Sequence, residues 1–143
     1  MNREEIKAIL PHREPMLLVD ECNIDGEYAN SRYTIPLDAF FVQGHFPGYP
    51  VVPGVILCEI MAQGSALLIP REILETNTAL YGGLDKVKFK NSAFPGDTVC
   101  THAKLVDMHF PLINVEAECS VNGKLCAKGL LKFFLVPNEK LGR

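Results

Sequence analysis

Two prolines, Pro53 and Pro70, enclose a segment of almost continuous apolar residues in the middle of the chain. Proline fits the first position of a helix, where its missing N–H costs nothing, but it disrupts a helix interior. The two prolines therefore predict a helix over residues 54–69, about 24 Å long at 1.5 Å per residue. Because apolar side chains occur on every face, such a helix has to be covered on all sides. The rest of the chain must supply a layer that surrounds it.

Strand patterns supply this layer. Residues 113–121 alternate between apolar and polar side chains, and residues 28–35 alternate with a more polar second face. Further strands are predicted at residues 17–21, 80–91, 98–108 and 124–136. Turns are predicted at Asp25-Gly26, at Pro95-Gly96-Asp97 and, as a type I′ hairpin, at Asn122-Gly123. The sequence thus predicts an α+β fold, with an antiparallel sheet wrapped around one long central helix.

The remaining segments are short. A helix capped by Asn2 is expected over Arg3–Leu10, a helix end and loop over Arg71–Thr76, and a polar tail from Pro137 onward. We therefore expect a single domain over residues 1–143, because 48% apolar residues suffice for a substantial core.

Composition narrows the classes of function. The net charge of −3 and the lack of a basic block argue against nucleic-acid binding. No secretory signal is visible at the start, and Glu59 and Gln63 interrupt the only apolar run long enough to suggest a membrane span. Five scattered cysteines without CxxC spacing favour reduced thiols in a cytoplasm over disulfides or a zinc site.

A possible acid–base pair stands around the start of the helix. Residues 40–54 are rich in glycine and proline, which indicates a stiff loop suited to carry function, and His45 lies in it. Glu59 lies within the apolar helix, where burial favours the protonated carboxyl group and hence an acid. Gln63, one turn later, is placed to hydrogen-bond Glu59 and orient it. The Gly54 amide at the helix start can face a developing negative charge.

Structural alternatives remain open for both side chains. A single loop histidine is more often solvated or structural, and a single glutamate in an apolar helix is more often a paired structural group. Their position on either side of one stiff loop and one helix start favours a functional pair.

One segment closely resembles the active-site motif of the 3-hydroxyacyl-acyl carrier protein dehydratases of the FabZ type, namely GHFPGYPVVPGVILCEIMAQ (residues 44–63). The chain also resembles the N-terminal signature of that family, at LPHREPMLLVD (residues 10–20). It resembles a later strand and turn of the family at LDKVKF (residues 84–89) and FPGD (residues 94–97). The likeness covers nearly the whole chain in the family's order.

The resemblance implies a hot-dog fold whose two protomers share a continuous sheet, often as a trimer of dimers. It implies that His45 of one protomer meets Glu59 of the other and takes the proton alpha to the thioester, while Glu59 helps the 3-hydroxyl leave as water. The Gly54 and Val51 amides would contact the carbonyl oxygen. The implied reaction converts (3R)-3-hydroxyacyl-acyl carrier protein to the trans-2-enoyl form in fatty-acid elongation, without a cofactor or metal.

Other residues receive weaker assignments. Glu59 stands where the related FabA-type enzymes carry Asp, which favours dehydration without isomerisation. Tyr81 is given a packing role and no gating role, and His12 a structural hydrogen bond. His102 and His109 are expected to face solvent, and Cys58 to pack. Lys86, Lys88 and Lys90 are expected to share one strand face that, with Arg13, attracts the acidic carrier protein.

Two other functions remain. A hot-dog acyl thioesterase would hydrolyse the thioester and release free thiol. A non-catalytic acyl-binding subunit would keep the pocket without turnover.

Overall fold

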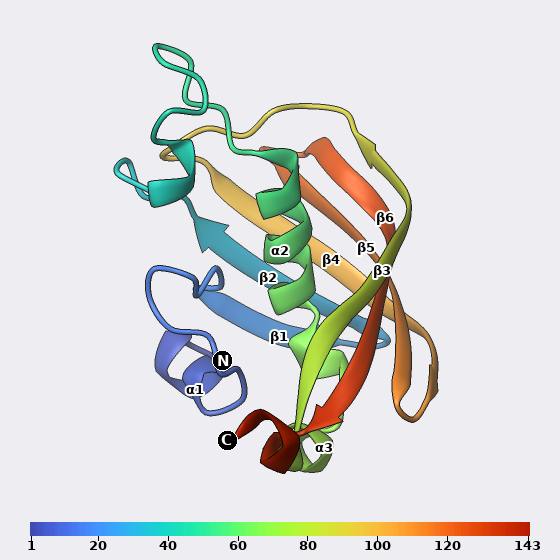
Figure 1. Cartoon of the computed structure of the whole chain (residues 1–143). Helices are drawn as coiled ribbons and strands as arrows, with labels where there is room; N and C mark the ends of the chain where they lie inside the picture. The colour runs from blue at the N-terminus through green and yellow to red at the C-terminus, as the bar shows by residue number, and fades with distance from the viewer.

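The computed structural model describes all residues from Met1 to Arg143. Six antiparallel strands form one curved sheet in the order β1-β2-β4-β5-β6-β3, and the sheet wraps around helix α2, Gly54–Gly64 (Figure 1). The strands are β1 (Glu21–Asp25), β2 (Tyr28–Thr34), β3 (Asn77–Phe89), β4 (Thr98–His109), β5 (Leu112–Val121) and β6 (Lys124–Pro137). The predicted architecture of a sheet around a central helix is confirmed.

The strands follow the side-chain alternation. On β5 the apolar set is buried, and the polar set between its members faces outward. The turn from β5 to β6 places Asn122 and Gly123 at φ 51° and 78°, the left-handed conformations that a type I′ hairpin requires. Between α2 and the sheet lies a core of 25 buried residues. At Gly64 the helix approaches the sheet so closely that a Cβ atom would lie 2.1 Å from Ser31 Oγ.

The central helix is shorter than predicted. It ends at Gly64, and residues Ala66–Leu68 form a separate 3₁₀ turn. The Ser65 hydroxyl donates to the Met61 carbonyl at 2.6 Å, and such back-bonding beside a glycine weakens helix continuation. The helix is also not covered on all sides, since Val55 is 73% exposed. One stretch of its surface therefore has no partner within the chain.

Strand β3 lies at the edge of the sheet and pairs only with β6. Leu84 on β3 is 48% exposed although its partner in register, Leu131, is buried. Phe89, near the end of the strand, is 53% exposed. An edge strand with exposed apolar side chains is a site where a second chain can pair.

The N-terminal segment packs across the far end of α2. Helix α1 spans Arg3–Lys7 rather than Arg3–Leu10, with the Asn2 side chain accepting from the Glu5 amide as predicted. The predicted strand at residues 17–21 is wrong, because ladder pairing begins only at Glu21. Side chains satisfy this backbone instead: Arg3 donates to the Leu17 and Val19 carbonyls.

Two other segments are more ordered than predicted. Residues Arg71–Thr76 form a short helix, α3, and Asn138–Leu141 form a 3₁₀ turn that returns Arg143 to the body. None of the helices combines the length and the apolar composition that crossing a membrane requires.

Candidate active site

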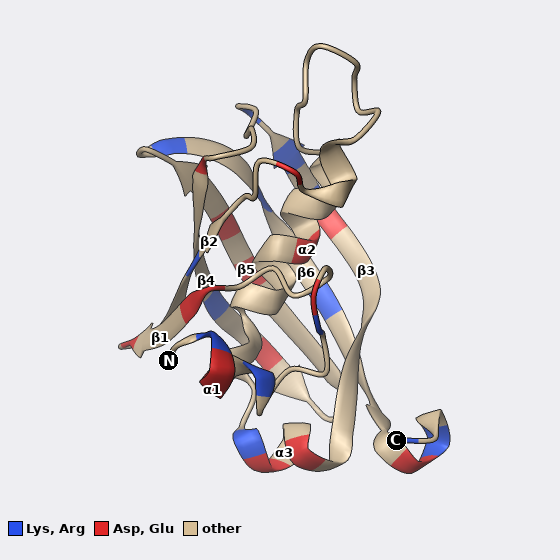
Figure 2. Cartoon of the chain, turned by 90° about the vertical axis from the view of Figure 1, so that its left-hand side faces the viewer, with Lys and Arg blue, Asp and Glu red and all other residues tan.

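Glu59 is the only charged residue of α2 and the acidic segment of that helix in Figure 2. Its side chain is 22% exposed. One oxygen, Oε1, lies 3.0 Å from Gln63 Nε2, which donates to it, and 3.4 Å from His12 Nε2. The other oxygen, Oε2, has no hydrogen bond within the chain. The carboxyl group is thus held by one oxygen and leaves the other open.

Gln63 fixes this arrangement. It is 3% exposed, and its Nε2 also donates to the Met16 carbonyl at 2.8 Å. Its Oε1 accepts from the Leu18 amide at 2.7 Å. The predicted contact between Gln63 and Glu59 is confirmed. The amide also ties the helix to the N-terminal segment, so its orientation leaves little freedom.

A pocket begins at Glu59 and continues past the end of α2. Glu59, His12 and Gln63 are its polar group near the helix. Most of its other lining is apolar and comes from the N-terminal segment, α2 and the strands: Ile9, Leu10, Pro11, Ala62, Ala66, Ile69, Leu74, Ala79, Val115 and Phe133. Four further polar side chains also line it, namely Ser65, Asn77, Thr78 and Arg143. A mostly apolar pocket with a few polar groups is typical of a small-molecule site.

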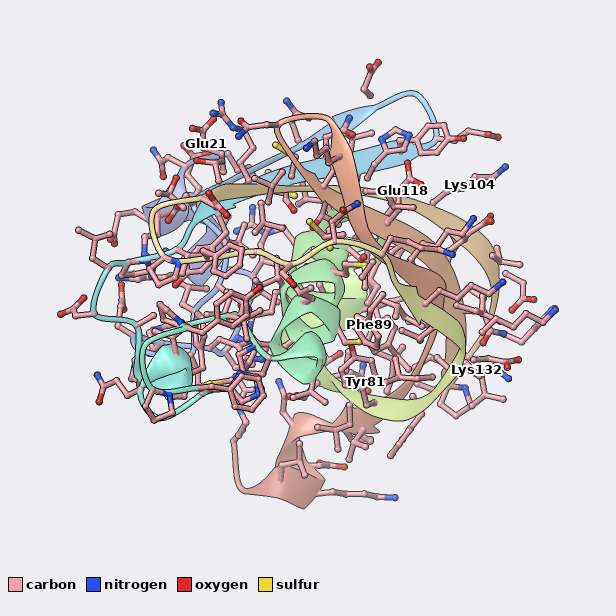
Figure 3. All side chains as sticks on the ribbon, turned by 90° about the horizontal axis from the view of Figure 1, so that it is seen from above. Glu21, Tyr81, Phe89, Lys104, Glu118 and Lys132 are labelled. Atoms are coloured by element: carbon pink, nitrogen blue, oxygen red, sulfur yellow. The ribbon has the colours of Figure 1, made fainter.

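Tyr81 forms a rigid wall of this pocket. Its hydroxyl donates to the Cys58 carbonyl at 2.6 Å, and its ring stacks on Phe133 with centroids 5.1 Å apart. Figure 3 shows Tyr81 and Phe89 of β3 beside α2. Burial, and next the negative charge of Glu59, raise the pKa of the Tyr81 hydroxyl, so it stays a donor. This fixed position agrees with the predicted packing role.

His45 lies elsewhere, in the uncharged loop that projects beyond the start of α2 (Figure 2). Its Nδ1 lies 2.9 Å from the Val51 carbonyl oxygen. Because a carbonyl only accepts, Nδ1 carries the hydrogen and Nε2 of the neutral ring keeps its lone pair. No hydrogen bond or ion pair joins His45 to Glu59 within the chain, and His45 does not line the pocket.

The tip of this loop is a tight turn. Phe46 and Tyr49 exchange backbone hydrogen bonds of 3.0 and 2.8 Å across Pro47 and Gly48. Gly48 has φ 77°, a conformation that favours glycine. The His45 ring stacks on Phe46 at a centroid distance of 4.4 Å, yet Phe46 itself is 56% exposed. The histidine is therefore oriented locally, on an element with few contacts to the core.

The two predicted backbone contacts differ. The Gly54 amide opens helix α2 and donates to no group of the chain, as expected of a first-turn N–H. A Cβ atom at Gly54 would lie 2.9 Å from the Phe89 ring, so the position favours glycine. The Val51 amide, in contrast, donates to the Tyr49 carbonyl at 2.8 Å. In this conformation only the Gly54 amide is free for a ligand.

The predicted row of lysines is wrong in part. The β3–β6 register shifts between Asp85 and Lys88, and Lys86 has φ 53°. Lys86 and Lys88 line a hollow on the sheet together with Lys104 and Lys128, and two carboxylates, Glu116 and Glu118, line it as well. Lys90 lies beyond the end of β3 and does not line this hollow. The Arg13 guanidinium donates to the carbonyls of Lys7, Leu10 and His12.

The remaining candidates stay apart from the pocket. His102 is exposed and stacks on Tyr28, and His109 is exposed on the β4 end. Cys58 is buried, as predicted, and all five cysteines are free thiols. No three His, Cys, Asp or Glu side chains gather in a way that could hold a metal ion.

His12 is a pocket residue whose position beside Glu59 sequence reasoning did not predict. A structural hydrogen bond was expected, whereas the structure sets its ring against the Glu59 carboxyl group. No periodicity or spacing links residue 12 to residue 59, because the contact depends on how the N-terminal segment crosses the end of α2. The one available signal was its place in the N-terminal signature.

The sheet around a central helix is the hot-dog fold. A solved structure, the dehydratase heterocomplex ApeI:P from Xenorhabdus doucetiae, has a TM-score of 0.78 and 20% identity and covers 95% of this chain and 93% of its own. The structure of a hypothetical thioesterase with coenzyme A from Streptococcus pneumoniae has a TM-score of 0.61 and 10% identity, and the match covers 82% of this chain and 85% of that one. At these identities the likenesses show the fold alone.

Sequence similarity defines the family. The model of the FabA-like domain matches residues 10–129. The 3-hydroxyacyl-[acyl-carrier-protein] dehydratase FabZ of Lactococcus lactis subsp. cremoris is 41% identical over 137 residues, which cover 94% of this chain and 95% of that protein. This chain belongs to the FabA-like family and, within it, to the FabZ-type dehydratases.

Proposed function

We propose that this protein dehydrates (3R)-3-hydroxyacyl groups on acyl carrier protein to the trans-2-enoyl form, in fatty-acid elongation. The observation that carries the proposal is Glu59, held by Gln63 with one oxygen free at the head of an apolar pocket. The 41% identity to a FabZ dehydratase supports the same reaction. The pocket takes the acyl tail, and the free oxygen faces the carbon that bears the hydroxyl.

Glu59 acts as the acid. A 3-hydroxyl group is a poor leaving group, and it departs as water when the carboxyl group supplies a proton through Oε2. The Gln63 hydrogen bond keeps the other oxygen occupied, so the proton donor has one orientation. Because Glu59 stands where FabA-type enzymes carry Asp, we propose dehydration without isomerisation.

His45 of a second protomer acts as the base. Its Nδ1–H is committed to the Val51 carbonyl, which leaves Nε2 to take the proton alpha to the thioester. Pairing of two β3 edges would cover the exposed Leu84 and extend the sheet across the dimer. Each dimer then has two sites, and three dimers assemble into a hexamer.

The Gly54 amide stabilises the enolate-like charge on the thioester oxygen while the alpha proton leaves. It is a free first-turn donor, and one such donor contributes about 3 kcal/mol in comparable sites. No step of this mechanism requires a metal or a redox cofactor.

The carrier protein, which is acidic, docks on the basic hollow around Lys86 and Lys88. Charge reversal at these two lysines should raise KM for the carrier-linked substrate at low salt and spare a pantetheine analogue. Arg13 and Lys90 are weaker contacts, because one binds backbone carbonyls and the other lies outside the hollow. Equal effects on both substrates would contradict this docking site.

A thioester assay tests the function itself. The protein is incubated with 3-hydroxyacyl thioester, and enoyl absorbance is recorded against free thiol. Enoyl product supports the dehydratase, free thiol alone supports a hot-dog thioesterase, and binding without either product supports an acyl-binding subunit. With five free thiols, we propose that the enzyme works in the cytoplasm.

A further inference from the structure

We propose that His12 is a positioning residue that holds the Glu59 carboxyl group and supports the negative charge it acquires on losing its proton. This inference rests on the proposed function. It goes beyond the acid–base pair, because it adds a second donor on the same carboxylate oxygen. His12 reaches that oxygen from a segment remote in sequence from α2.

Two side-chain nitrogens approach Glu59 on one side, and one of them, Gln63 Nε2, donates a hydrogen bond. Gln63 Nε2 lies 3.0 Å and His12 Nε2 lies 3.4 Å from the same atom, Oε1. The His12 contact is close but is not an aligned hydrogen bond, and catalytic hydrogen bonds are often long or poorly aligned before a substrate closes a site. With both nitrogens at Oε1, Oε2 is the oxygen that remains for the substrate.

The other ring nitrogen shows how His12 uses its hydrogen. Its Nδ1 is buried and has no partner. With the acid proton on Oε2, Oε1 is a carbonyl-type oxygen that only accepts. A hydrogen on the neutral ring that serves Glu59 is therefore on Nε2, and Nδ1 is an unpaired acceptor. A buried polar atom without a partner costs free energy. The ring therefore directs its single N–H toward Glu59, while its other nitrogen, Nδ1, stays buried without a hydrogen-bond partner.

The segment that carries His12 is fixed by the residues that fix Glu59. Gln63 binds Glu59 and, a few residues after His12, the Met16 carbonyl and the Leu18 amide. Arg13 donates to the His12 carbonyl at 2.7 Å. The relative position of His12 and Glu59 is thus set within one chain, without help from a partner.

The chemical benefit arises during proton transfer. When Glu59 protonates the departing hydroxyl, its carboxyl group becomes a carboxylate. N–H donors at Oε1 bind a carboxylate more strongly than a neutral acid, so they stabilise the transition state more than the bound substrate. Loss of the His12 donor should therefore lower kcat and leave KM nearly unchanged.

Three variants separate this role from packing. His12→Phe keeps a ring without a donor, and kcat should fall about 10- to 100-fold, less than for a donor that touches the substrate directly. His12→Gln places an amide nitrogen at the same bond count as Nε2 and should restore kcat to within about 5-fold of wild type. His12→Asn places it at the position of the unpaired Nδ1 and should behave like Phe.

The same variants combined with Glu59→Gln complete the test. If His12 acts through Glu59, His12→Phe should cause no further loss in that background. Full kcat in His12→Phe, rescue by Asn equal to that by Gln, or an additive loss in the double variant would overturn the inference. Absence of turnover in the wild type would instead count against the proposed function, so the two failures are distinguishable.

Discussion

Glu59 and His45 are held by the chain in different ways. Glu59 stands on a helix packed into the sheet, and Gln63, itself buried and bonded to the N-terminal segment, holds its carboxyl group. His45 stands on a projecting loop and is oriented by one hydrogen bond to Val51 and by stacking on Phe46. The acid is pre-organised by tertiary structure, and the base by its own loop.

This difference shows what one chain completes and what it leaves to assembly. Gln63 and His12 occupy the side of Glu59 at Oε1, and no residue of the chain bonds Oε2. The open side lies next to a helix face that includes the exposed Val55. The proposed dimer would bring the His45 loop of a second protomer to that open side. The following predictions test this division between the two halves of the site.

The largest effect is expected from the proposed acid and base themselves. His45→Ala and Glu59→Gln should each lower kcat by about 10³-fold or more, since each removes one proton-transfer group. If the site is shared between protomers, mixing the two inactive variants should restore activity. Random exchange makes half of the dimers mixed, and each mixed dimer has one intact site, so about a quarter of wild-type activity should return.

The recovered rate is measured after the mixture has been unfolded and refolded together, with each variant refolded alone as the control. A site contained within one chain would stay inactive in every mixture, because each chain carries one defect. That outcome would contradict the shared site.

A somewhat smaller effect is expected from breaking the β3 edge. Leu84→Lys places a charge on the exposed apolar edge strand and should convert dimers to monomers, with about 10²-fold loss of kcat/KM. Leu112→Lys is the matched control, because Leu112 is 57% exposed on an interior strand. Sedimentation at matched concentrations measures the change. Monomers that keep full activity would show that one chain is sufficient.

Local patterns predicted most of the sheet. The alternation on β5 and the Asn122-Gly123 hairpin depend on neighbours in sequence, and the structure agrees with both. The end of α2 was not predictable in the same way. It depends on the Ser65 back-bond and on the fit of Gly64 against Ser31, which exist only once the sheet is formed.

In the candidate site, too, contacts between neighbours in sequence were predictable and long-range contacts were not. The contact between Glu59 and Gln63 is one helical turn in length, so the spacing predicted it. The contact with His12 joins residues 47 positions apart and left no local signal. Likewise, the bulge between Asp85 and Lys88 arises from strand pairing, since an even alternation in sequence does not reveal an irregular register.

Variants of Gln63 test how firmly the chain holds the Glu59 carboxyl group before substrate binds. Gln63→Leu should lower kcat about 10- to 100-fold, because Glu59 loses its closer donor, and should destabilise the fold by about 1–3 kcal/mol, because the Leu18 amide is left unpaired. Gln63→Glu is the control, since it keeps an acceptor for Leu18 but provides no donor to Glu59. Denaturant unfolding and steady-state kinetics separate the two effects. Unchanged kcat in both variants would contradict the positioning role.

The smallest effect is expected at Gly54, whose amide is the proposed donor to the thioester oxygen. Gly54→Ala adds a Cβ atom 2.9 Å from the Phe89 ring, so either the ring or the start of α2 has to shift by a few tenths of an ångström. Overpacking of this kind costs about 1–3 kcal/mol, and displacement of the Gly54 amide should lower kcat up to about 10-fold. Phe89→Leu in the same chain makes room for the methyl group. If the shift is the cause, the double variant should recover both the unfolding midpoint and kcat. Recovery of the midpoint without kcat would show that the amide is displaced for another reason, and wild-type kcat in Gly54→Ala would argue that this amide does not contact the thioester oxygen.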